Sequence, residues 1–540
     1  MDFTFRTTVS APWGTDFSHV PYGFLWMVIY RWFPIITNEL FAYNFVLLSS
    51  FVLSGFFMYL LAYFITKNHL ASFISGLIYS FCPYHFQRSW EHFSLAQIQW
   101  IPLYLLALFK LQKDFNWKSI LLFVVASSFI LQMEINYVLI VGICTFFYFV
   151  FIFLRNVSLN LLSHKRNVHS FVNELSVEIK SFFKFFLSGI VVILINFTFI
   201  WSVVRALFIS PEASAATADL GQRSFHYLFS QSARFLNYII PSSSNPFLGG
   251  LARSLEGSIF YGRSPIEQTL YLGWIPIILS FVAWKTKSKT LGSSDSKQKI
   301  PFFVGLFGFL AISGFLFSLP PTFGFGSFKI YSPSFFMYKF LPMFRAYARF
   351  GLLVICSISV LAGVGFHFFC KRFKSNRVVA FFSIVIISII LFEFNNVPPV
   401  RITDLSNPPQ VYAWLAEQEG DFIVAEYPLG DPSPGETYVE LDYLLYQRYH
   451  RKRLLNGVLP DTQAHSIVQQ VFKIADRNTP KILRSLEVRY AIVHLDRYRD
   501  GTNKKAVDIV GELPDMSRSK GLKLIKKFGD DEIYQVTVQK

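Results

Sequence analysis

Polar and ionisable side chains stand at the ends of several long apolar runs, and their types allow acid–base chemistry and phosphate binding. One group follows Pro83 directly and contains His85, Arg88, Glu91 and His92. Carboxylates and imidazoles can take up or release protons near neutral pH. Arginine binds phosphate bidentately through its planar guanidinium group. Glu91 and His92 are therefore candidate catalytic residues.

Other candidates come from distant parts of the chain. Asp16, in the N-terminal segment, is a third candidate catalytic residue. The candidates for binding a substrate are Glu134, Asn136, Glu267, Arg345 and Arg349. The two arginines are four residues apart at the start of a predicted helix, where side chains at this spacing share one face. Together they could grip one phosphate group or two adjacent ones.

Each candidate also has a purely structural interpretation. Arg88 and Trp90 could anchor a helix end among lipid headgroups. Glu134 could cap a helix, and Glu267 could be favoured by a helix dipole. The arginines could pair with Glu134, Glu267 or Glu91 and only hold the helices together. Three acidic residues near the C-terminus are interpreted as ordinary charges at strand ends: Asp421, Glu426 and Asp431.

The elements that must position these residues are mostly membrane helices. Hydrophobic residues make up 53% of the 540 residues and charged residues 16%, against roughly 25% charged in a soluble domain. A bilayer core requires about 20 apolar residues of helix. The runs predict about ten transmembrane helices: near 41–65, 70–85, 93–110, 117–133, 136–154, 183–206, 267–284, 301–318, 349–370 and 378–395.

The distribution of Lys and Arg predicts the orientation. The connections on one side of the predicted helices are rich in both residues, and the short connections on the other side contain almost none apart from Arg88. By the positive-inside rule the basic side is cytoplasmic. The candidate residues and the C-terminal region then lie outside the cell, and the protein is expected in the plasma (inner) membrane. The charge of +16 is explained by topology, and no nucleic-acid partner is expected.

This topology also places residues 1–39 outside, although no apolar segment precedes them. Met1–Ser10 is polar and is not typical of a signal peptide. We therefore expect that an upstream helix is missing and that 1–39 is the remainder of a first outer loop. The alternative is that a short N-terminal tail crosses the membrane unaided.

The predicted domains are the outer segment 1–39, a helical membrane domain at 40–396 with outer loops at 207–266 and 319–348, and a soluble domain at 397–540. The last begins at a proline-rich linker, which is typical of a domain boundary. Helices are predicted at 409–418, 438–449 and 480–486, and strands at 422–427, 489–494, 523–528 and 532–536. This domain is predicted to have an α/β fold.

Motifs of soluble nucleotide-binding or zinc enzymes are absent from the sequence. The four cysteines lie in or at the ends of apolar runs without metal-ligand spacing: Cys82, Cys144, Cys356 and Cys370. We interpret them as small core residues.

The order of several short segments resembles bacterial multi-pass proteins of the GT-C glycosyltransferase superfamily, in a largely uncharacterised branch. The segments are Ala11-Pro-Trp-Gly-Thr-Asp16, Glu39-Leu-Phe-Ala-Tyr-Asn44, Ser80-Phe-Cys-Pro-Tyr84, Glu91-His92, Tyr271-Leu-Gly273, Leu341-Pro-Met-Phe-Arg-Ala-Tyr-Ala-Arg-Phe350 and Glu426-Tyr-Pro428. Each motif is weak by itself, and the resemblance covers nearly the whole chain.

The resemblance implies a hexosyltransferase-type activity that takes a sugar from a polyprenyl-phosphate donor in the membrane. In such enzymes a carboxylate of the first outer loop acts as base or as metal ligand. The resemblance therefore leaves open whether this protein uses a divalent metal as a cofactor. Asp16 is the surviving candidate for that carboxylate, since the helix that normally precedes this loop is absent here.

Two other classes of function remain alternatives. One is a lipid or glycan transporter, although no internal symmetry or pair of broken helices is visible. The other is a non-catalytic assembly protein that binds a partner through its C-terminal domain. The sequence leaves the acceptor and the oligomeric state open.

Overall fold

The structure is a computed structural model, and it describes residues 5–6, 8–16, 24–162, 168–208, 225, 227–262, 264–290, 299–325, 328–342, 344, 346–398, 407–430, 438–458, 462–499 and 513–537. The chain divides into two compact units. One contains Tyr22–Ile200 and Gln222–Arg401 and is called the helical unit here. The other contains Met1–Pro21, Trp201–Gly221 and Ile402–Lys540 and is called the terminal unit.

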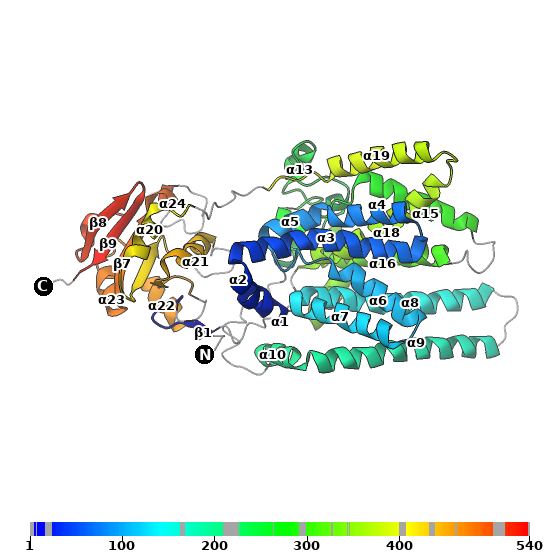
Figure 1. The fold of residues 1–540 in the computed structure, drawn as a ribbon, viewed down its shortest axis with the longest axis horizontal. Coiled ribbons are helices and arrows are strands. Elements are labelled where there is room, and N and C mark those ends of the chain that lie inside the picture. Colours follow the sequence, from blue (N-terminus) through cyan, green and yellow to red (C-terminus); the bar gives the residue numbers. More distant parts are fainter. Residues whose placement is uncertain are drawn as a thin grey trace. The chain divides into compact units, whose positions relative to one another are not determined.

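Long helices make up most of the helical unit (Figure 1). The first half contains α1 (Phe24–Met27), a π-helix (Val28–Trp32), α2 (Phe33–Ile36), α3 (Glu39–Thr66), α4 (His69–Ser80), α5 (Pro83–Glu91), α6 (Trp100–Lys113), α7 (Trp117–Met133), α8 (Ile135–Leu162), α9 (Val168–Ile195) and α10 (Phe197–Phe208), whose last residues fall in the terminal unit.

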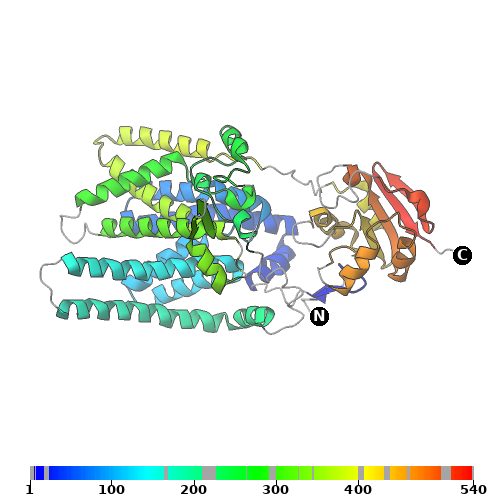
Figure 2. The same ribbon diagram turned by 180° about the vertical axis from the view of Figure 1, so that it is seen from behind.

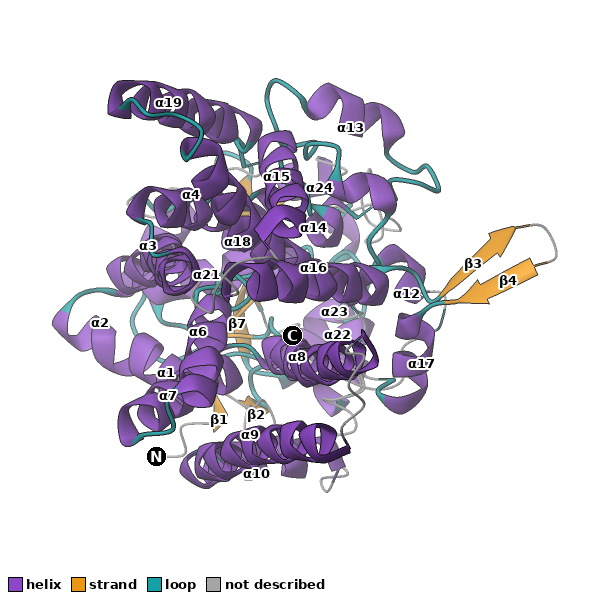
Figure 3. Ribbon diagram, turned by 90° about the vertical axis from the view of Figure 1, so that its right-hand side faces the viewer, coloured by secondary structure: helices purple, strands orange, loops and turns teal. Residues whose placement is uncertain are grey.

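The second half of the helical unit contains shorter elements between its long helices. These are α12 (Tyr227–Ser230), a 3-10 helix (Phe235–Tyr238), α13 (Gly249–Leu255), α14 (Pro265–Gln268), α15 (Trp274–Thr290), α16 (Lys299–Ser318), the hairpin β3–β4 (Thr322–Phe325 and Phe328–Tyr331), α17 (Pro333–Phe340), the 3-10 helix η5 (Tyr347–Phe350), α18 (Gly351–Cys370) and α19 (Asn376–Glu393). In Figure 3, seen along the long helices, α18 lies among α4, α15 and α16, and it packs against all three.

The protein is a polytopic membrane protein. In the described part of the chain, five helices are long and apolar enough to cross a bilayer: Glu39–Thr66, Ile135–Ser158, Ile300–Ser318, Tyr347–Cys370 and Asn376–Glu393. A sixth span results if the bent pair Glu178–Ile195 and Phe197–Val204 counts as one. The count of about ten spans and the orientation stay predictions.

Several predicted helices are interrupted, and each interruption has a local cause. The run 70–85 ends at Ser80, and a new helix starts at Pro83, a residue favoured at the first helical position. The run 183–206 bends by 78° at Asn196, whose side chain binds the carbonyl oxygen of Val192.

The predicted helices 93–110 and 267–284 begin later than expected. Residues 93–99 form turns, and α6 starts only at Trp100. The segment 269–273 is not helical, and Gly273, the residue before α15, adopts a φ of +83°, in the left-handed region that glycine enters readily. The break separates α14 from α15 and leaves Glu267 in a short helix of its own.

A five-stranded mixed sheet forms the centre of the terminal unit, with strand order β6-β5-β7-β9-β8. Strands β5 (Ile423–Tyr427), β6 (Arg453–Leu454) and β7 (Val488–His494) are parallel, whereas β9 (Asp531–Val536) is antiparallel to β7 and β8 (Leu522–Phe528). Figure 2 shows this sheet from behind. Its helices are α20 (Gln410–Glu417), α21 (Tyr438–His450), α22 (Gln463–Gln470), α23 (Thr479–Ser485), α24 (Leu495–Arg499) and a 3-10 helix (Met516–Arg518).

The α/β prediction for this region is confirmed, including every predicted strand, whereas β6, α22, α24 and the 3-10 helix were not predicted. Alternate residues of β5 and β7 contribute their side chains to two apolar cores, one on each face of the sheet. One core is shared with α20 and α21, the other with α22 and α23.

The N-terminal segment, with short strands β1 (Phe5–Arg6) and β2 (Thr15–Asp16), packs on this same sheet. The amide of Ser10 donates to the carbonyl of Asn456 (2.8 Å), and that of Ala11 donates to the carbonyl of Leu454 (2.8 Å). The amide of Leu454 donates in return to Thr8 (2.9 Å). Residues 8–11 therefore cover the free edge of β6.

Candidate functional site

Helix α5 carries the polar centre of the helical unit. It is only nine residues long, and it follows directly on the end of α4. Gln87, Arg88 and Glu91 lie within one turn of each other near its C-terminus, and Arg88 is fully buried. The guanidinium carbon of Arg88 lies 5.0 Å from the centre of the Tyr84 ring, at a distance typical of a cation–π contact.

Two arginines converge on one carboxylate at this place. Arg88 donates from both terminal nitrogens to the two oxygens of Glu267, at 3.3 and 2.5 Å. Arg349 donates from Nε and a terminal nitrogen to the same two oxygens, at 3.2 and 2.7 Å. We call Arg88, Glu267 and Arg349 the arginine triad. It joins residues that are up to 261 positions apart, since Arg88 and Arg349 come from α5 and η5.

The arginine triad is buried and carries one net positive charge, because two guanidinium groups face one carboxylate. The exposed fractions are 0% for Arg88, 4% for Glu267 and 7% for Arg349. Burial by itself would raise the pKa of Glu267, but the two guanidinium groups hold it well below its ordinary value. Ion pairs buried in this way seldom add net stability over apolar residues.

Backbone contacts hold Glu267 and Arg349 in place. Gln268, next to Glu267, donates from its side-chain amide to the carbonyl of Ser232 (2.8 Å). The amide of Ala348, next to Arg349, donates to the carbonyl of Gln231 (3.0 Å). The segment around residue 231 therefore fixes α14 and η5 to each other.

Glu91 lies one turn beyond Arg88 and is half-buried. The side-chain amide of Gln87 donates to its Oε1 (3.0 Å). Its Oε2 is buried and accepts no hydrogen bond from any described residue. Burial raises the pKa of Glu91, although the Gln87 hydrogen bond and the charge of Arg88 oppose this effect. A desolvated carboxylate with one unused oxygen is typical of a proton-transfer group.

Glu134 and Asn136 lie at the junction of α7 and α8. Glu134 is buried, and its Oε1 accepts from the backbone amide of Asn136 (3.0 Å) and also from that residue's side-chain amide. Its Oε2 accepts from the hydroxyl of Ser94 (2.6 Å). Both oxygens are thus used to start α8 and to tie it to the turn after α5, in agreement with the helix-capping interpretation.

The remaining predicted residues are not brought to the arginine triad by the described structure. His92 follows α5 directly and is half-buried. The backbone of Asp16 pairs with Phe5 in the terminal unit. Arg345 lies outside the described residues, so the proposed sharing of one face with Arg349 stays a prediction. Of the pairings foreseen for the arginines, the one between Arg349 and Glu267 is present.

Arg88 is the residue whose importance sequence reasoning underestimated. The prediction that it anchors α5 among lipid headgroups is wrong, since its side chain is completely buried and paired. One sequence signal did exist: Arg88 is the single Lys or Arg in the segment 86–92 between two apolar runs, and Glu267 is the single Asp or Glu between Glu256 and Asp295.

A second buried polar cluster lies in the terminal unit, where neighbouring strands place three side chains on one face of the sheet. His494 contacts Glu426 through Nε2 (3.0 Å) and Asp531 through Nδ1 (2.7 Å). Tyr412 donates to Glu426 (2.8 Å). We call Glu426, His494 and Asp531 the histidine cluster. The prediction that Glu426 is an ordinary strand-end charge is wrong, because α20 and α21 cover the end of β5 and bury it completely.

Within the described residues, no group of three or more His, Cys, Asp or Glu side chains could hold a metal ion. The four cysteines are free thiols; Cys82, Cys144 and Cys356 are buried and Cys370 is partly exposed.

No protein-family model matches the sequence, and no curated protein sequence matches it. Solved structures do show similarity. The arabinofuranosyltransferase AftD from Mycobacteria matches with 13% identity and a TM-score of 0.48, over 99% of this chain and 37% of that chain. This chain therefore spans little more than a third of AftD.

The archaeal oligosaccharyltransferase AglB from Archaeoglobus fulgidus, solved with an inhibitory peptide and a dolichol-phosphate, matches with 11% identity and a TM-score of 0.46. The match covers 99% of this chain and 68% of that chain. Both similar proteins are glycosyl-transferring enzymes by name. At these identities and TM-scores the likeness concerns the path of the chain and gives no information on substrates.

Proposed function

We propose that the protein is a membrane glycosyltransferase that moves a sugar from a polyprenyl-phosphate donor to an extracytoplasmic glycan, lipid or protein acceptor. The observation that carries the proposal is the buried arginine triad, with its one net positive charge, next to the half-buried carboxylate of Glu91. The plasma membrane and an external site are part of the proposal.

The arginine triad supplies a fixed positive potential for a phosphate. The ion pairs within the triad fix the positions of its three charged groups, so these groups do not rearrange when the donor binds. Burial in a medium of low dielectric constant strengthens the electric field of the triad at the donor phosphate. Arg349 is the member with some exposure, and together with Arg345 it is the proposed contact for the donor phosphate. Asn136 and Glu134 would shape the site by positioning α8.

Glu91 is the proposed general base. The acceptor hydroxyl gives its proton to the free oxygen of Glu91, and the acceptor oxygen bonds to the anomeric carbon of the sugar. The bond between that carbon and the phosphate oxygen breaks, and the polyprenyl phosphate leaves with the electron pair, its charge balanced by the arginines. Asp16 and His92 remain candidates for proton transfer, and Asp16 for a metal ligand.

The test is sugar transfer by the purified protein in proteoliposomes, supplied with a panel of radiolabelled polyprenyl-phosphate sugars. Glu91→Gln should lower the rate by about 10²–10⁴-fold, the usual contribution of a general base. Glu256→Gln, an exposed glutamate of the same unit, is the matched control and should keep full activity. An equally active Glu91→Gln variant would remove Glu91 from the mechanism, and transfer from no donor would contradict the proposed function.

One observation favours a non-catalytic assembly protein as the second candidate. Both oxygens of Glu267 are occupied by guanidinium groups, so the arginine triad is also a self-contained structural link. For such a protein, Arg349→Lys would lower stability without changing the use of any donor. For the enzyme, the same variant should raise the KM for the donor, because lysine keeps the charge and loses the bidentate fork.

A further inference from the structure

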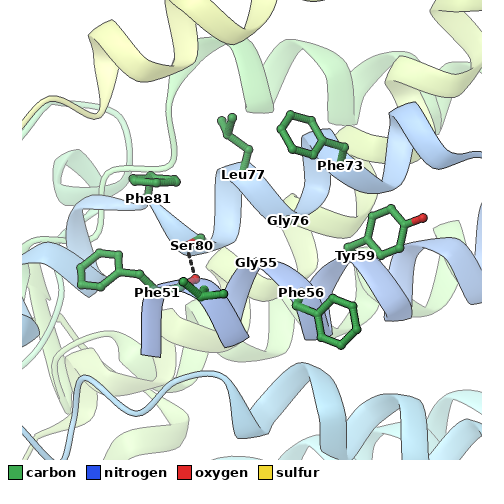
Figure 4. Close-up of a pocket in the computed structure, with 10 residues that line it drawn as sticks. Phe51, Gly55, Phe56, Tyr59, Phe73, Gly76, Leu77, Ser80 and Phe81 are labelled. Atoms are coloured by element: carbon green, nitrogen blue, oxygen red, sulfur yellow. Dashed lines mark hydrogen bonds between the residues drawn. The ribbon is translucent and has the colours of Figure 1, made fainter. Parts of the chain in front are cut away.

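Side-chain hydrogen bonds fix the start of α5 against α3. The hydroxyl of Ser80, the last residue of α4, donates to the carbonyl of Phe51 on α3, as the dashed line in Figure 4 shows. His85, on α5, contacts the carbonyl of Ser80 through Nδ1 (2.8 Å) and the hydroxyl of Ser50 through Nε2 (3.0 Å). The first turn of α5 therefore has a set position, and it holds the side chains that follow on the same helix.

Two of these following side chains, Gln87 and Glu91, are bonded to each other, and we call them the Gln–Glu pair. They are four residues apart on α5, a spacing that places side chains on one face of a helix. The side-chain amide of Gln87 donates to Oε1 of Glu91 (3.0 Å). Because a carboxylate only accepts hydrogen bonds, this contact also fixes which end of the Gln87 amide is its oxygen.

Each member of the Gln–Glu pair keeps one oxygen unused. Oε1 of Gln87 and Oε2 of Glu91 are both buried, and neither accepts a hydrogen bond from a described residue. The whole side chain of Gln87 is buried, with 2% of its surface exposed. A buried acceptor without a donor is costly, so each such oxygen calls for a partner. The pair therefore suits a ligand with two hydrogen-bond donors side by side.

Neutral hydroxyl groups fit this place better than an ammonium group does. Arg88 lies between the two residues in the sequence, and its positive charge is close enough to act on Glu91. The arginine triad, to which Arg88 belongs, carries one net positive charge. This charge repels an ammonium group and leaves a hydroxyl group unaffected. Because one hydroxyl donates one hydrogen bond, two hydroxyls are needed for the two oxygens.

We propose that the Gln–Glu pair binds a vicinal diol of the acceptor, which makes the acceptor a glycan and not a protein or lipid with a single hydroxyl group. The reacting hydroxyl donates to Oε2 of Glu91, and the hydroxyl on the adjacent carbon donates to Oε1 of Gln87. Gln87 is then a residue that determines acceptor specificity. The terminal torsions of Gln and Glu are broad, so both oxygens can turn towards the acceptor without movement of α5. The proposal rests on the proposed function for the transfer step.

Matched acceptors test the proposal. The probes are methyl hexopyranosides and methyl pentofuranosides, each beside its mono-deoxy analogues, and a serine-containing peptide. They are added to the proteoliposomes with the donor panel described above. Loss of the hydroxyl next to the reacting one should lower kcat/KM by about 5–150-fold, which corresponds to one buried oxygen left unpaired. Equal use of an intact glycoside and its deoxy analogues, or preferred use of the peptide, would overturn the proposal.

A glutamine variant shows whether the preference comes from Gln87. Gln87→Met keeps the length of the side chain and removes its oxygen. The variant should lose the preference for the intact glycoside, because the substitution and the missing hydroxyl remove the same contact. If Gln87→Met does not fold, Gln87→Asn withdraws the amide by one methylene group and carries the same expectation. A variant that keeps the full preference would show that Gln87 is only a structural partner of Glu91.

The matched control is Gln112→Met. Gln112 lies on a different helix, α6, where its side-chain amide bonds to Ser181 of α9. This variant also loses a glutamine side-chain contact of the helical unit, and it should keep the parent's preference between intact and deoxy glycosides. Loss of the preference in this variant too would trace it to general loosening of the helices and contradict the role of Gln87.

Binding separates this proposal from the proposed function. Saturation-transfer NMR measures the binding of the same glycosides to the full-length protein in nanodiscs, with no donor present. Binding that depends on adjacent hydroxyls, in a protein that transfers no sugar, would support the diol site and contradict the enzyme. Transfer that is indifferent to adjacent hydroxyls would contradict the diol site and leave the enzyme intact. Neither binding nor transfer would contradict both.

Discussion

The arginine triad and the histidine cluster are both groups of three ionisable side chains, buried except for the partly exposed Asp531, and they differ in net charge and in chemistry. The arginine triad has one carboxylate between two cations, which stay charged at every physiological pH. The histidine cluster has one imidazole between two carboxylates. Its charge depends on a proton.

The two groups therefore use buried charge differently: the charge of the arginine triad is constant, and that of the histidine cluster changes with pH. The arginine triad gives the helical unit a constant positive potential, which suits the binding of an anionic lipid phosphate. In the histidine cluster, burial alone would lower the pKa of His494, but its bonds to Asp531 and Glu426 raise it. The terminal unit is thus expected to respond to pH, whereas the arginine triad is not.

The largest expected effect is that of Glu267→Gln, which leaves two buried guanidinium groups without a counter-charge. Breaking a buried ionic group in this way costs about 3–5 kcal/mol. Thermal unfolding of the full-length protein in nanodiscs measures the loss. The triple variant Arg88→Met, Glu267→Leu and Arg349→Met should recover most of the stability but no donor binding. A Glu267→Gln protein as stable as the parent would mean that the arginine triad is not a closed ionic group.

The second effect is the pH dependence of the terminal unit. Because the pKa of His494 is raised in the folded state, its stabilising contribution is complete below the unfolded pKa of about 6.5. The contribution is lost as the pH rises through the higher folded pKa. Each tenfold increase in the proton affinity of His494 on folding corresponds to about 1.4 kcal/mol of this pH-dependent stability.

Hydrogen exchange of β7 and β9 between about pH 5.5 and 8.5 measures this effect in the full-length protein, with intrinsic exchange rates corrected for pH. Protection should decrease with rising pH in the parent. His494→Gln should abolish the slope, and His465→Gln on α22 should keep it. A slope of the opposite sign would mean that His494 is neutral when folded.

The smallest effect is expected for Tyr412→Phe, which removes the hydroxyl that donates to Glu426 and keeps the ring stacked on Tyr446. Losing one hydrogen bond to a buried carboxylate should cost about 1.5–3 kcal/mol at most. The same exchange experiment should find the loss on β5 and β7. Tyr449→Phe, on the neighbouring helix α21, is the control and should change little.

Local patterns in the sequence predicted most helices and strands. They did not predict the contacts between residues that are distant in the sequence. The strand Phe422–Tyr427 was visible as an apolar run between turn residues, and α7 was visible between Asn116 and Glu134. The breaks at 93–99 and 269–273 were not predicted, because neither segment contains a charged residue or a proline.

In the candidate site too, the sequence predicted individual residues but not the contacts between them. Glu91, Glu267 and Arg349 were singled out as ionisable residues at the ends of apolar runs. Their grouping depends on a contact between α5 and α14, 179 residues apart in the chain, and no local pattern encodes it. The burial of Glu426 likewise follows from the helices that cover β5, which lie elsewhere in the sequence.

The pairing of residues 8–11 with β6 restricts the number of times that the chain can cross the membrane between these two segments. The backbone hydrogen bonds that join residues 8–11 to Leu454 and Asn456 can form only if both segments are in the same aqueous compartment. The chain between them must therefore cross the bilayer an even number of times. Any topology map with an odd number of crossings between residues 24 and 398 would leave β6 and its N-terminal partner on opposite faces of the membrane.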